Sequence, residues 1–362
     1  MLVRLGGLFH GRSARPLRGM TARIAPRRAF RRAMTVPITS HLLYVAAQLG
    51  LADHLNDGPR NSGDMARLIG ADARTLHRVM RGLVAAGLLS EDADGRFALT
   101  PVGAYLRSDI PGSLRGQIVF EGELARAWSA LPHTVRTGEN AFRHVFGLGI
   151  FDHFARNPAV QAYVARTQGG AASRVAASLV VASYNFAGVG TVVDVGGGRG
   201  TLLAAILRAH PTMRGVLFDR PGVVAEARDG LEAAGLGSRC DIVAGDFFQS
   251  VPAGGDAYAL RRIIHDWDDE QALRILAACR QAMAGQIHGQ GRLLLIERVM
   301  PERVEQAPAV VVADLIMLVE TGGRERTVGE YRALLAAAGF RLSRLTAITG
   351  QDSVIEAQPI GS

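Results

Sequence analysis

The stretch that most constrains the fold is residues 191–201 (TVVDVGGGRGT), in which a β-branched run ends in four glycines. The run TVVDV predicts a buried strand, because branched apolar side chains pack well on a pleated sheet. The glycines predict a tight turn whose backbone can approach a ligand closely. They are Gly196, Gly197, Gly198 and Gly200. Residues 202–209 (LLAAILRA) return to helical spacing, so strand, glycine turn and helix together indicate a binding site for a small molecule.

The glycine turn alone does not identify that molecule. Dinucleotide-binding folds carry G-x-G-x-x-G at this place, but Thr201 stands where the third glycine belongs. The pattern in this chain is D-x-G-x-G-x-G, beginning at Asp194 and ending at Gly200. Because a glycine turn is often only a turn, its function has to be inferred from the strands that follow it.

Length and composition limit the class of protein. A chain of 362 residues with 48% hydrophobic residues favours about two domains with sizeable cores. No apolar run reaches the roughly 18 residues of a membrane span. The two cysteines, Cys240 and Cys279, lie far apart without a partner motif, which is typical of a reducing compartment. We therefore expect a cytoplasmic protein without disulfides that does not bind a membrane.

The basic charge is concentrated at the N-terminus. All 41 basic residues are arginine, and nine of them lie in residues 1–33, which contain no Asp or Glu. Without that leader the net charge changes from +8 to −1, so the rest of the chain offers no electrostatic footprint for nucleic acid. The absence of lysine excludes a Walker A loop, a pyridoxal Schiff base and a lysine general base.

The leader itself, residues 1–33, has the arginine-rich, acid-free composition of a transit peptide. The alternatives are a disordered arm or an over-extended start, with Met20 or Met34 as the true first residue. We favour these alternatives over targeting, and predict that residues 1–33 form a disordered basic leader.

Residues 34–110 predict a winged-helix domain. Three helical stretches and a hairpin are expected at residues 38–58, 62–68, 72–89 and 90–100. Asp94-Gly95 is the turn signal of the hairpin. One face of the third helical stretch is apolar, formed by Leu76, Val79, Leu83 and Val84. Helices followed by a β-hairpin are the order of elements in a winged helix.

A winged helix permits two interpretations. Its third helix could read DNA through Arg74, His77, Arg78 and Arg81. Alternatively, these side chains form the solvated face of a dimerisation or substrate-covering domain. We favour the second interpretation, because a domain with catalytic features follows and because fold does not determine function.

The remaining chain predicts a helical region over residues 111–186 and an α/β catalytic domain over 187–362. Strands are expected at residues 191–195, 215–219, 240–244, 256–262, 292–298, 341–349 and 353–358. Helical stretches alternate with the first five strands, which indicates a Rossmann-like, mostly parallel sheet. Only residues 350–352 separate the last two strands, so we expect them to form an antiparallel hairpin.

Polar residues stand at the ends of the predicted strands. Such ends line the ligand site of a doubly wound sheet. They are Asp219, Asp246-Phe247, His265-Asp266-Trp267 and Glu297. Each also has a structural alternative: Asp219 could cap the next helix, and Asp268 or Asp269 is expected to cap the helix over 270–283. The capping role argues against a metal cluster in DWDDE. Four such ends around one glycine turn nevertheless indicate a site.

Five sequence pieces carry a resemblance to a known family. They are DVGGGRG (194–200), GVLFDRPGVV (215–224), GDFFQSVP (245–252), RRIIHDWDDEQALRIL (261–276) and DLIMLVETGGRERT (314–327). On these pieces residues 188–358 resemble class I S-adenosylmethionine-dependent methyltransferases. With residues 38–186 in front, the chain resembles the caffeic-acid/hydroxyneurosporene type of small-molecule O-methyltransferase. Only residues 1–33 lie outside the resemblance.

The resemblance implies S-adenosyl-L-methionine as methyl donor, S-adenosyl-L-homocysteine as product, and no metal. It also implies a homodimer whose N-terminal domains intertwine and help to close the partner's acceptor site. The residues implied to bind the cofactor are Asp194, Gly196, Gly197, Gly198, Asp219, Asp246, Phe247 and Arg261. Among them, the glycines would hold the methionine moiety, Asp219 the ribose, and Asp246 with Phe247 the adenine. Arg261 stands where plant relatives often carry lysine, a position thought to act through its backbone carbonyl.

The resemblance further implies that His265 is the general base and that Glu297 and Glu325 flank it. Free imidazole titrates near ~6.5 and a phenol near ~10, so His265 would accept the proton as methyl transfer proceeds. Carboxylates beside it would fix its tautomer and stabilise imidazolium. The predicted acceptor pocket is built by Phe142, Phe146, Tyr163, Thr167, Asp266 and Met317.

We therefore expect an O-methyltransferase that acts on a hydroxyl, most simply a phenol, of an aromatic or polyketide-like small molecule. Two alternatives stay open. One keeps the fold and cofactor but performs N-methylation or a non-methylating reaction. The other is a DNA-binding regulator that senses S-adenosylmethionine, which a salt-dependent duplex-binding assay would reveal.

Overall fold

The structure is a computed structural model that describes residues 26–110, 112–156, 170–284, 291–348 and 352–360. It divides into two compact units, an N-terminal unit that ends at Arg126 and a C-terminal unit that begins at Ala127. Among the described residues, no helix is both long and apolar enough to cross a membrane.

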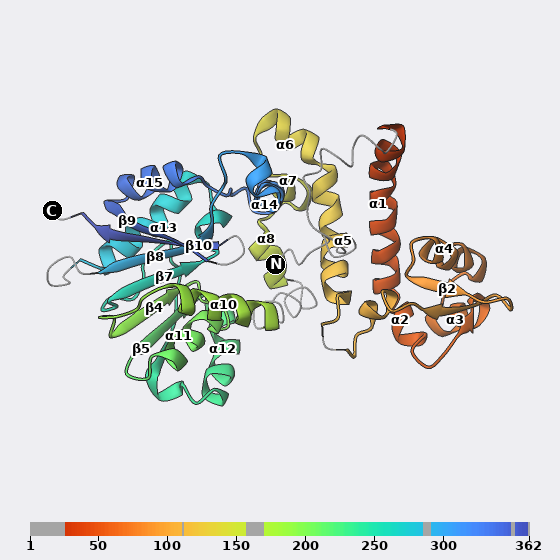
Figure 1. Cartoon of the computed structure of the whole chain (residues 1–362), viewed down its shortest axis with the longest axis horizontal. Coiled ribbons are helices and arrows are strands. Elements are labelled where there is room, and N and C mark those ends of the chain that lie inside the picture. The colour runs from red at the N-terminus through yellow and green to blue at the C-terminus, as the bar shows by residue number, and fades with distance from the viewer. Residues whose placement is uncertain (1–25, 111, 157–169, 285–290, 349–351, 361–362) are drawn as a thin grey trace. The chain divides into compact units, whose positions relative to one another are not determined.

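The N-terminal unit is mostly helical with a small antiparallel sheet (Figure 1). Its elements are α1 (Pro26–Gln48), α2 (Leu51–His54), β1 (Arg60–Asn61), α3 (Ser62–Ile69), α4 (Ala73–Ala85), β2 (Leu89–Glu91), β3 (Arg96–Leu99), the 3-10 helix η3 (Gly103–Leu106) and, as far as Arg126, α5 (Arg115–Ser129). The sheet order is β1-β3-β2. Helices α3 and α4 and the β2–β3 hairpin thus follow one another in the predicted order.

The core of this unit forms along the apolar face of α4. Leu76 and Leu83 are buried as predicted, whereas Val79 and Val84 are only partly buried at its margin. Met80, which the sequence analysis did not single out, is completely buried. The helix starts where expected, because the Asp72 side chain accepts a hydrogen bond from Thr75 N at 2.8 Å.

Helix α1 includes part of the predicted leader. It begins at Pro26, so residues 26–33 are helical where a disordered arm was expected. Proline is tolerated in the first turn of a helix, and the arginines and alanines that follow are good helix formers. Residues 1–25 of the leader lie outside the described residues.

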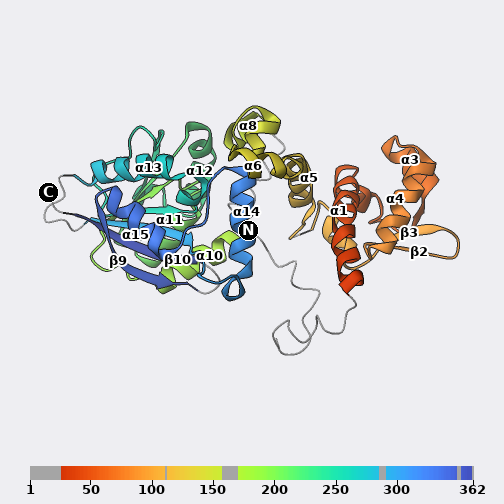
Figure 2. The same cartoon turned by 90° about the horizontal axis from the view of Figure 1, so that it is seen from above.

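The C-terminal unit is an α/β domain (Figures 1 and 2). Its helices are α6 (Leu131–Thr137), α7 (Ala141–Phe146), α8 (Ile150–Arg156), α10 (Ala171–Ser183), α11 (Thr201–Ala209), α12 (Pro221–Ala233), η4 (Gly237–Arg239), η5 (Ile264–Asp266), α13 (Asp269–Ala282), η7 (Val304–Gln306), α14 (Pro308–Glu320) and α15 (Val328–Ala337). Its strands are β4 (Thr191–Val195), β5 (Arg214–Asp219), β6 (Cys240–Ala244), β7 (Ala257–Arg261), β8 (Arg292–Arg298), β9 (Phe340–Ala347) and β10 (Asp352–Pro359).

The seven strands form one sheet in the order β6-β5-β4-β7-β8-β10-β9. The first five are parallel, and β10 runs antiparallel to both β8 and β9. The predicted mostly parallel sheet with a terminal antiparallel hairpin is therefore confirmed. Each predicted strand also has its counterpart, with ends that differ by no more than two residues.

Both faces of the sheet are buried. Val192 faces a core shared with α10, α11 and α12, whereas its neighbour Val193 faces a second core shared with α13 and α15. This alternation follows from the two-residue period of a strand. Figure 1 shows the two helical layers on either side of the sheet, and Figure 2 shows α15 beside the hairpin, where it packs against β9. The carboxyl ends of β4, β5, β7 and β8 consequently meet at one edge.

Candidate active site

The glycine turn after β4 has the tight geometry that its sequence predicts. Gly196, Gly198 and Gly200 have φ angles of 68°, 59° and 70°, a left-handed conformation that other residues rarely adopt. Gly196 N donates to Phe218 O at 2.8 Å, which joins the turn to β5. A Cβ atom on Gly196 would stand 2.5 Å from Ile263 Cδ1. The turn therefore has no room for side chains on its inner side.

Asp219, at the end of β5, lies directly against this turn. Its Oδ2 accepts from Gly198 N at 2.8 Å and its Oδ1 from Arg220 N at 2.7 Å. Burial raises the pKa of this carboxyl, although both backbone bonds oppose the shift. Each oxygen keeps a second lone pair, so the carboxylate can accept from two neighbouring hydroxyls.

Asp194 is buried beneath the glycine turn. It is 1% exposed, and a Cβ atom on Gly197 would stand 2.7 Å from its Cγ. Burial raises its pKa to about 7, against the charge of Arg261. Asp194 Oδ2 and Arg261 Nε have no hydrogen-bond partner among the described residues. These two polar atoms are thus left available near the predicted cofactor site.

Phe247 brings an aromatic ring to the same turn. Its Cε1 lies 3.6 Å from the position of a Cβ on Gly196, and its ring centroid lies 6.1 Å from that of Trp267. The neighbouring Asp246 is exposed, and its Oδ1 accepts from Phe248 N at 2.9 Å. Of the residues predicted to bind the cofactor, Asp219 and Phe247 therefore lie directly against the glycine turn.

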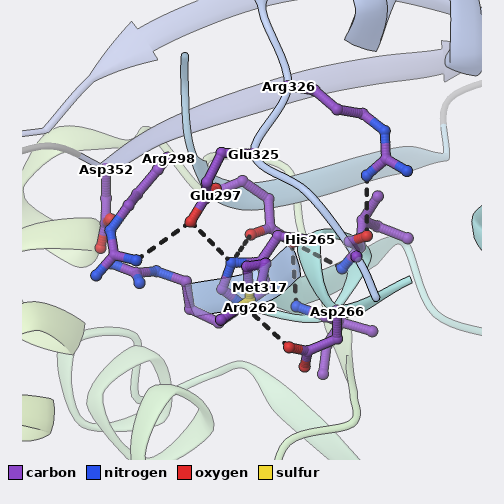
Figure 3. Close-up of polar contacts among 12 residues, drawn as sticks. Arg262, His265, Asp266, Glu297, Arg298, Met317, Glu325, Arg326 and Asp352 are labelled. Carbon is purple, nitrogen blue, oxygen red and sulfur yellow. Dashed lines mark hydrogen bonds and ion pairs between the residues drawn. The ribbon is translucent and has the colours of Figure 1, made fainter. Parts of the chain in front are cut away.

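His265 lies within a buried cluster of carboxylates (Figure 3). Its Nδ1 is 3.1 Å from Glu325 Oε1 and 3.9 Å from Glu297 Oε2, and its Nε2 is 3.6 Å from Asp266 Oδ1. Figure 3 shows these side chains converging from η5, from β8 and from the loop before α15. The fold thus brings together all three residues predicted to take part in proton transfer.

The backbone around His265 is fixed by contacts from distant parts of the chain. Glu297 Oε1 accepts from Ile263 N at 3.0 Å and from Ile264 N at 2.8 Å. Arg262, just before them, has a φ of 57°, which is strained for a non-glycine residue and typical of functional sites. A Cβ atom on Gly323 would stand 2.0 Å from His265 O. The position of His265 is therefore closely defined.

The electrostatics favour a protonated His265. Burial alone would lower its pKa, but the charges of Glu297, Asp266 and Glu325 outweigh it and raise the pKa to about 9. Burial likewise raises the pKa of Glu297 to about 7 and that of Asp266 to about 6, against the charge of His265. For Glu325, burial is outweighed by the hydrogen bond and charge of His265 and by Arg298, so its pKa is lowered.

The cluster could be considered as a metal site, because ligand atoms of His265, Glu297 and Glu325 lie within 4.8 Å of one another. Each carboxylate is already engaged through one oxygen, whereas Glu297 Oε2 and Glu325 Oε2 have no hydrogen-bond partner among the described residues. Glu297 Oε1 accepts two backbone N–H groups, and Glu325 Oε1 contacts both His265 and the guanidinium of Arg298. A fixed positive charge beside the cluster disfavours a cation. We therefore interpret it as a site of proton transfer.

The predicted acceptor residues are brought together only in part. Phe142 and Phe146 stack at 4.4 Å on α7, where Phe142 is completely buried and can only support the wall of a pocket. Asn140 Nδ2 donates to Leu318 O at 3.1 Å, which joins the start of α7 to α14, the helix that carries Met317. Two further predicted pocket residues, Tyr163 and Thr167, lie outside the described residues.

The arginines of the cluster were not predicted from the sequence. Arg298 follows Glu297 directly and contacts Glu325, and Arg262 pairs with Asp352 at the start of β10. Arg326 is completely buried and donates to Ile264 O and Trp267 O. Each of these arginines directly follows a predicted site residue in the sequence, and this position could have indicated that it belongs to the site.

The comparisons agree with this geometry. The chain matches the family model of the O-methyltransferase domain over residues 128–341 and that of the O-methyltransferase dimerisation domain over residues 33–109. It belongs to the O-methyltransferase family. The expected class of enzyme, an S-adenosylmethionine-dependent methyltransferase, is thereby confirmed.

Three individual proteins illustrate the similarity. The chain is 42% identical to a phenazine O-methyltransferase of Lysobacter antibioticus, over 91% of this chain and 98% of that one. It is 37% identical to a phenazine-1-carboxylate N-methyltransferase of Pseudomonas aeruginosa, over 88% and 93% of the two chains. A solved O-methyltransferase from neocarzinostatin biosynthesis, in complex with S-adenosylmethionine and 2-hydroxy-5-methyl naphthoic acid, has a TM-score of 0.77 and 34% identity, with 89% and 96% coverage.

Proposed function

We propose that the protein transfers the methyl group of S-adenosylmethionine to a hydroxyl, most simply a phenol, of an aromatic or polyketide-like small molecule, with His265 as general base. One observation carries the proposal. Ile263 packs beneath Gly196 of the glycine turn, and two residues later His265 stands in the carboxylate cluster. The proposed cofactor site and the proposed base are thus joined by a single short segment.

The residues around the glycine turn fit the cofactor. The turn approaches closely enough for the methionine moiety, Asp219 can accept from both ribose hydroxyls, and Phe247 offers its ring to the adenine. Asp246 would accept from the adenine amino group with its remaining lone pairs. Asp194 Oδ2 and Arg261 Nε are unpaired in the described structure, which suits the charged ends of an amino acid. S-adenosylmethionine supplies an electrophilic methyl group on a sulfonium.

His265 would remove the acceptor's proton. In its neutral form, which the raised pKa makes the minor form at neutral pH, His265 donates from Nδ1–H to Glu325 Oε1, and Nε2 carries the lone pair that would accept the proton of the acceptor hydroxyl. A base with a pKa of about 9 is well matched to a phenol that titrates near ~10, because proton transfer between them is nearly balanced. Glu297, Asp266 and Glu325 would stabilise the imidazolium that forms.

We also propose that the protein is a homodimer through residues 34–110. The match to the dimerisation domain supports this, and so does the apolar surface of α1, where Phe30, Met34 and Ile38 are exposed in the single chain. Residues 111–186 would contribute the acceptor pocket and 187–362 the cofactor site. We propose a cytoplasmic location, with neither nucleic acid nor membrane as partner, and no metal.

A second candidate function is N-methylation. One relative that is 37% identical carries the name of an N-methyltransferase, and an amine acceptor needs the same cofactor site. Such an acceptor does not need a base that matches a phenol, so the carboxylate-supported His265 favours the hydroxyl.

A labelled-methyl screen with phenolic and amine acceptors tests the choice, with calorimetry of S-adenosylhomocysteine as a control for an intact cofactor site. Labelling of phenols supports the proposal, whereas labelling of amines alone favours the second candidate. Binding of S-adenosylhomocysteine without labelling of any acceptor in either set contradicts the proposed function.

A further inference from the structure

Arg298 is the last residue of β8 and points into the proton-transfer cluster (Figure 3). It is 7% exposed. Its Nη1 donates to Glu325 Oε1 at 3.2 Å, and the same oxygen lies 3.1 Å from His265 Nδ1. One carboxylate oxygen therefore accepts from the imidazole on one side and from a guanidinium on the other.

The charged and titratable groups around His265 come from every neighbouring element. They are Glu297 and Arg298 from β8, Asp266 from η5, Arg262 from the position directly after β7, Glu325 and Arg326 from the loop before α15, Tyr331 from α15, Asp314 from α14, and Asp352 from β10. Several of these have another fixed partner. Arg262 pairs with Asp352, Arg326 pairs with Asp269, and Asp314 Oδ1 accepts from Glu325 N at 2.8 Å.

Arg298 differs from the other described cations in its position. In the described part of the chain, Arg262 and Arg326 donate hydrogen bonds to groups other than the three carboxylates beside His265. Only Arg298, among the described arginines, donates to a carboxylate that His265 itself contacts. Burial strengthens the electrostatic effect of this contact, because a charge in a dry environment interacts more strongly than one in water.

We propose that Arg298 is a positioning residue: it holds Glu325 Oε1 in place for His265 and offsets part of its negative charge, so that it sets the pH range in which His265 can accept a proton. This inference rests on the proposed role of His265 as general base. Arg298 acts only through Glu325 and needs no contact with the acceptor or the cofactor.

The direction of the effect follows from the charges. If Arg298 loses its charge, Glu325 acts on His265 with its full negative charge, and the imidazolium becomes more stable. The pKa of His265 then rises above its value of about 9. A nearby charge typically shifts a pKa by ~1 unit or more, so the fraction of neutral His265 at neutral pH would fall by about tenfold.

The test is an NMR titration of histidine side chains in the full chain, without acceptor. The protein has ten histidines, and the signal of His265 is identified by its absence in His265→Ala. We expect Arg298→Met to raise the titration midpoint of His265 by about one pH unit. Arg298→Lys, which keeps the charge, should titrate like the unaltered protein.

Arg324→Met is the matched control. Arg324 is the residue directly before Glu325, but it pairs with Asp269 and Glu330 at 3.0 and 3.2 Å, away from His265. Its removal should leave the midpoint unchanged. An unchanged midpoint in Arg298→Met, or the same shift in Arg324→Met or Arg298→Lys, overturns the proposal.

A double variant keeps the test valid if Arg298→Met does not fold. Glu325→Gln removes the carboxylate through which Arg298 is proposed to act. Adding Arg298→Met to Glu325→Gln should then move the His265 midpoint by less than half a pH unit, because only the direct effect of the Arg298 charge on the imidazolium remains. A further shift of half a pH unit or more in this background means that Arg298 acts independently of Glu325 and overturns the proposal.

The pH dependence of turnover separates this inference from the proposed function. If both hold, the acidic limb of the kcat profile in Arg298→Met moves to higher pH together with the NMR midpoint. If the NMR midpoint moves but the unaltered protein methylates no acceptor, the proposed function fails while the electrostatic role of Arg298 stands. If turnover is normal and the midpoint does not move, Arg298 has only a structural role.

Discussion

The buried guanidinium of Arg326 should be a main source of stability for the segment that carries His265. The side chain is completely buried. It donates to Ile264 O at 3.0 Å and to Trp267 O at 2.9 Å, one carbonyl on each side of His265. It also pairs with Asp269, whose side chain is 55% exposed.

The cost of Arg326→Met can be estimated from these contacts. A hydrogen bond from a charged group contributes about 1.5–3 kcal/mol, so the two carbonyl contacts together contribute on the order of 3–6 kcal/mol. The ion pair with the half-exposed Asp269 adds little, because such pairs contribute about 0–1 kcal/mol. We therefore expect Arg326→Met to lower the free energy of unfolding by about 3 kcal/mol or more. Arg326→Lys should recover only part of it, since an ammonium cannot reach all three partners.

Urea unfolding followed by tryptophan fluorescence is a suitable assay, because both tryptophans, Trp128 and Trp267, belong to the C-terminal unit. Arg324→Met is the matched control, since this 43% exposed side chain pairs with the same Asp269 and should cost less than about 1 kcal/mol. If Arg326→Met and Arg324→Met have the same free energy of unfolding within about 1 kcal/mol, the carbonyl contacts of Arg326 do not stabilise the segment that carries His265.

Two further substitutions test the geometry of the site. Gly323→Ala would place a Cβ atom 2.0 Å from His265 O, so we expect a loss of about 1–3 kcal/mol in stability together with lowered turnover. Gly329→Ala is the control, because no neighbour of its Cβ lies closer than 3.8 Å, and it should change neither stability nor turnover. Unchanged stability and turnover in Gly323→Ala would show that the loop is not packed on η5. Asp219→Ala should weaken binding of S-adenosylhomocysteine by tenfold or more in calorimetry, because charge-assisted hydrogen bonds are lost. Asp229→Ala, on the exposed side of α12, should leave the affinity unchanged. Equal affinities in the two variants would show that Asp219 does not belong to the cofactor site.

The elements around the glycine turn could be predicted because their signals are local. Residues 191–209 show a strand period, then glycines with left-handed φ angles, then a helical period, and each signal lies within a few residues. The hairpin of β9 and β10 could be predicted for the same reason, because the link between the strands is short. Asp268, one of two candidates, caps α13 by accepting from Gln271 N.

The supports of His265 could not be predicted, because they depend on contacts between distant segments. Arg298 and Glu325 are 27 residues apart, and Arg326 and Ile264 are 62 apart. Composition alone suggests that arginine is exposed, whereas Arg326 is completely buried. The left-handed φ of Arg262 likewise arises beside a tertiary contact, in which Glu297 accepts from the next two backbone N–H groups.

In the proposed mechanism, His265 accepts the proton of the acceptor, whereas other residues, around the glycine turn, bind the cofactor. The most direct test compares His265→Ala with the unaltered protein in labelled-methyl turnover and in calorimetry of S-adenosylhomocysteine. We predict that the variant binds S-adenosylhomocysteine with unchanged affinity and loses turnover by about 10²–10⁴-fold, the usual contribution of a general base. Turnover within a few-fold of the unaltered protein would contradict the claim.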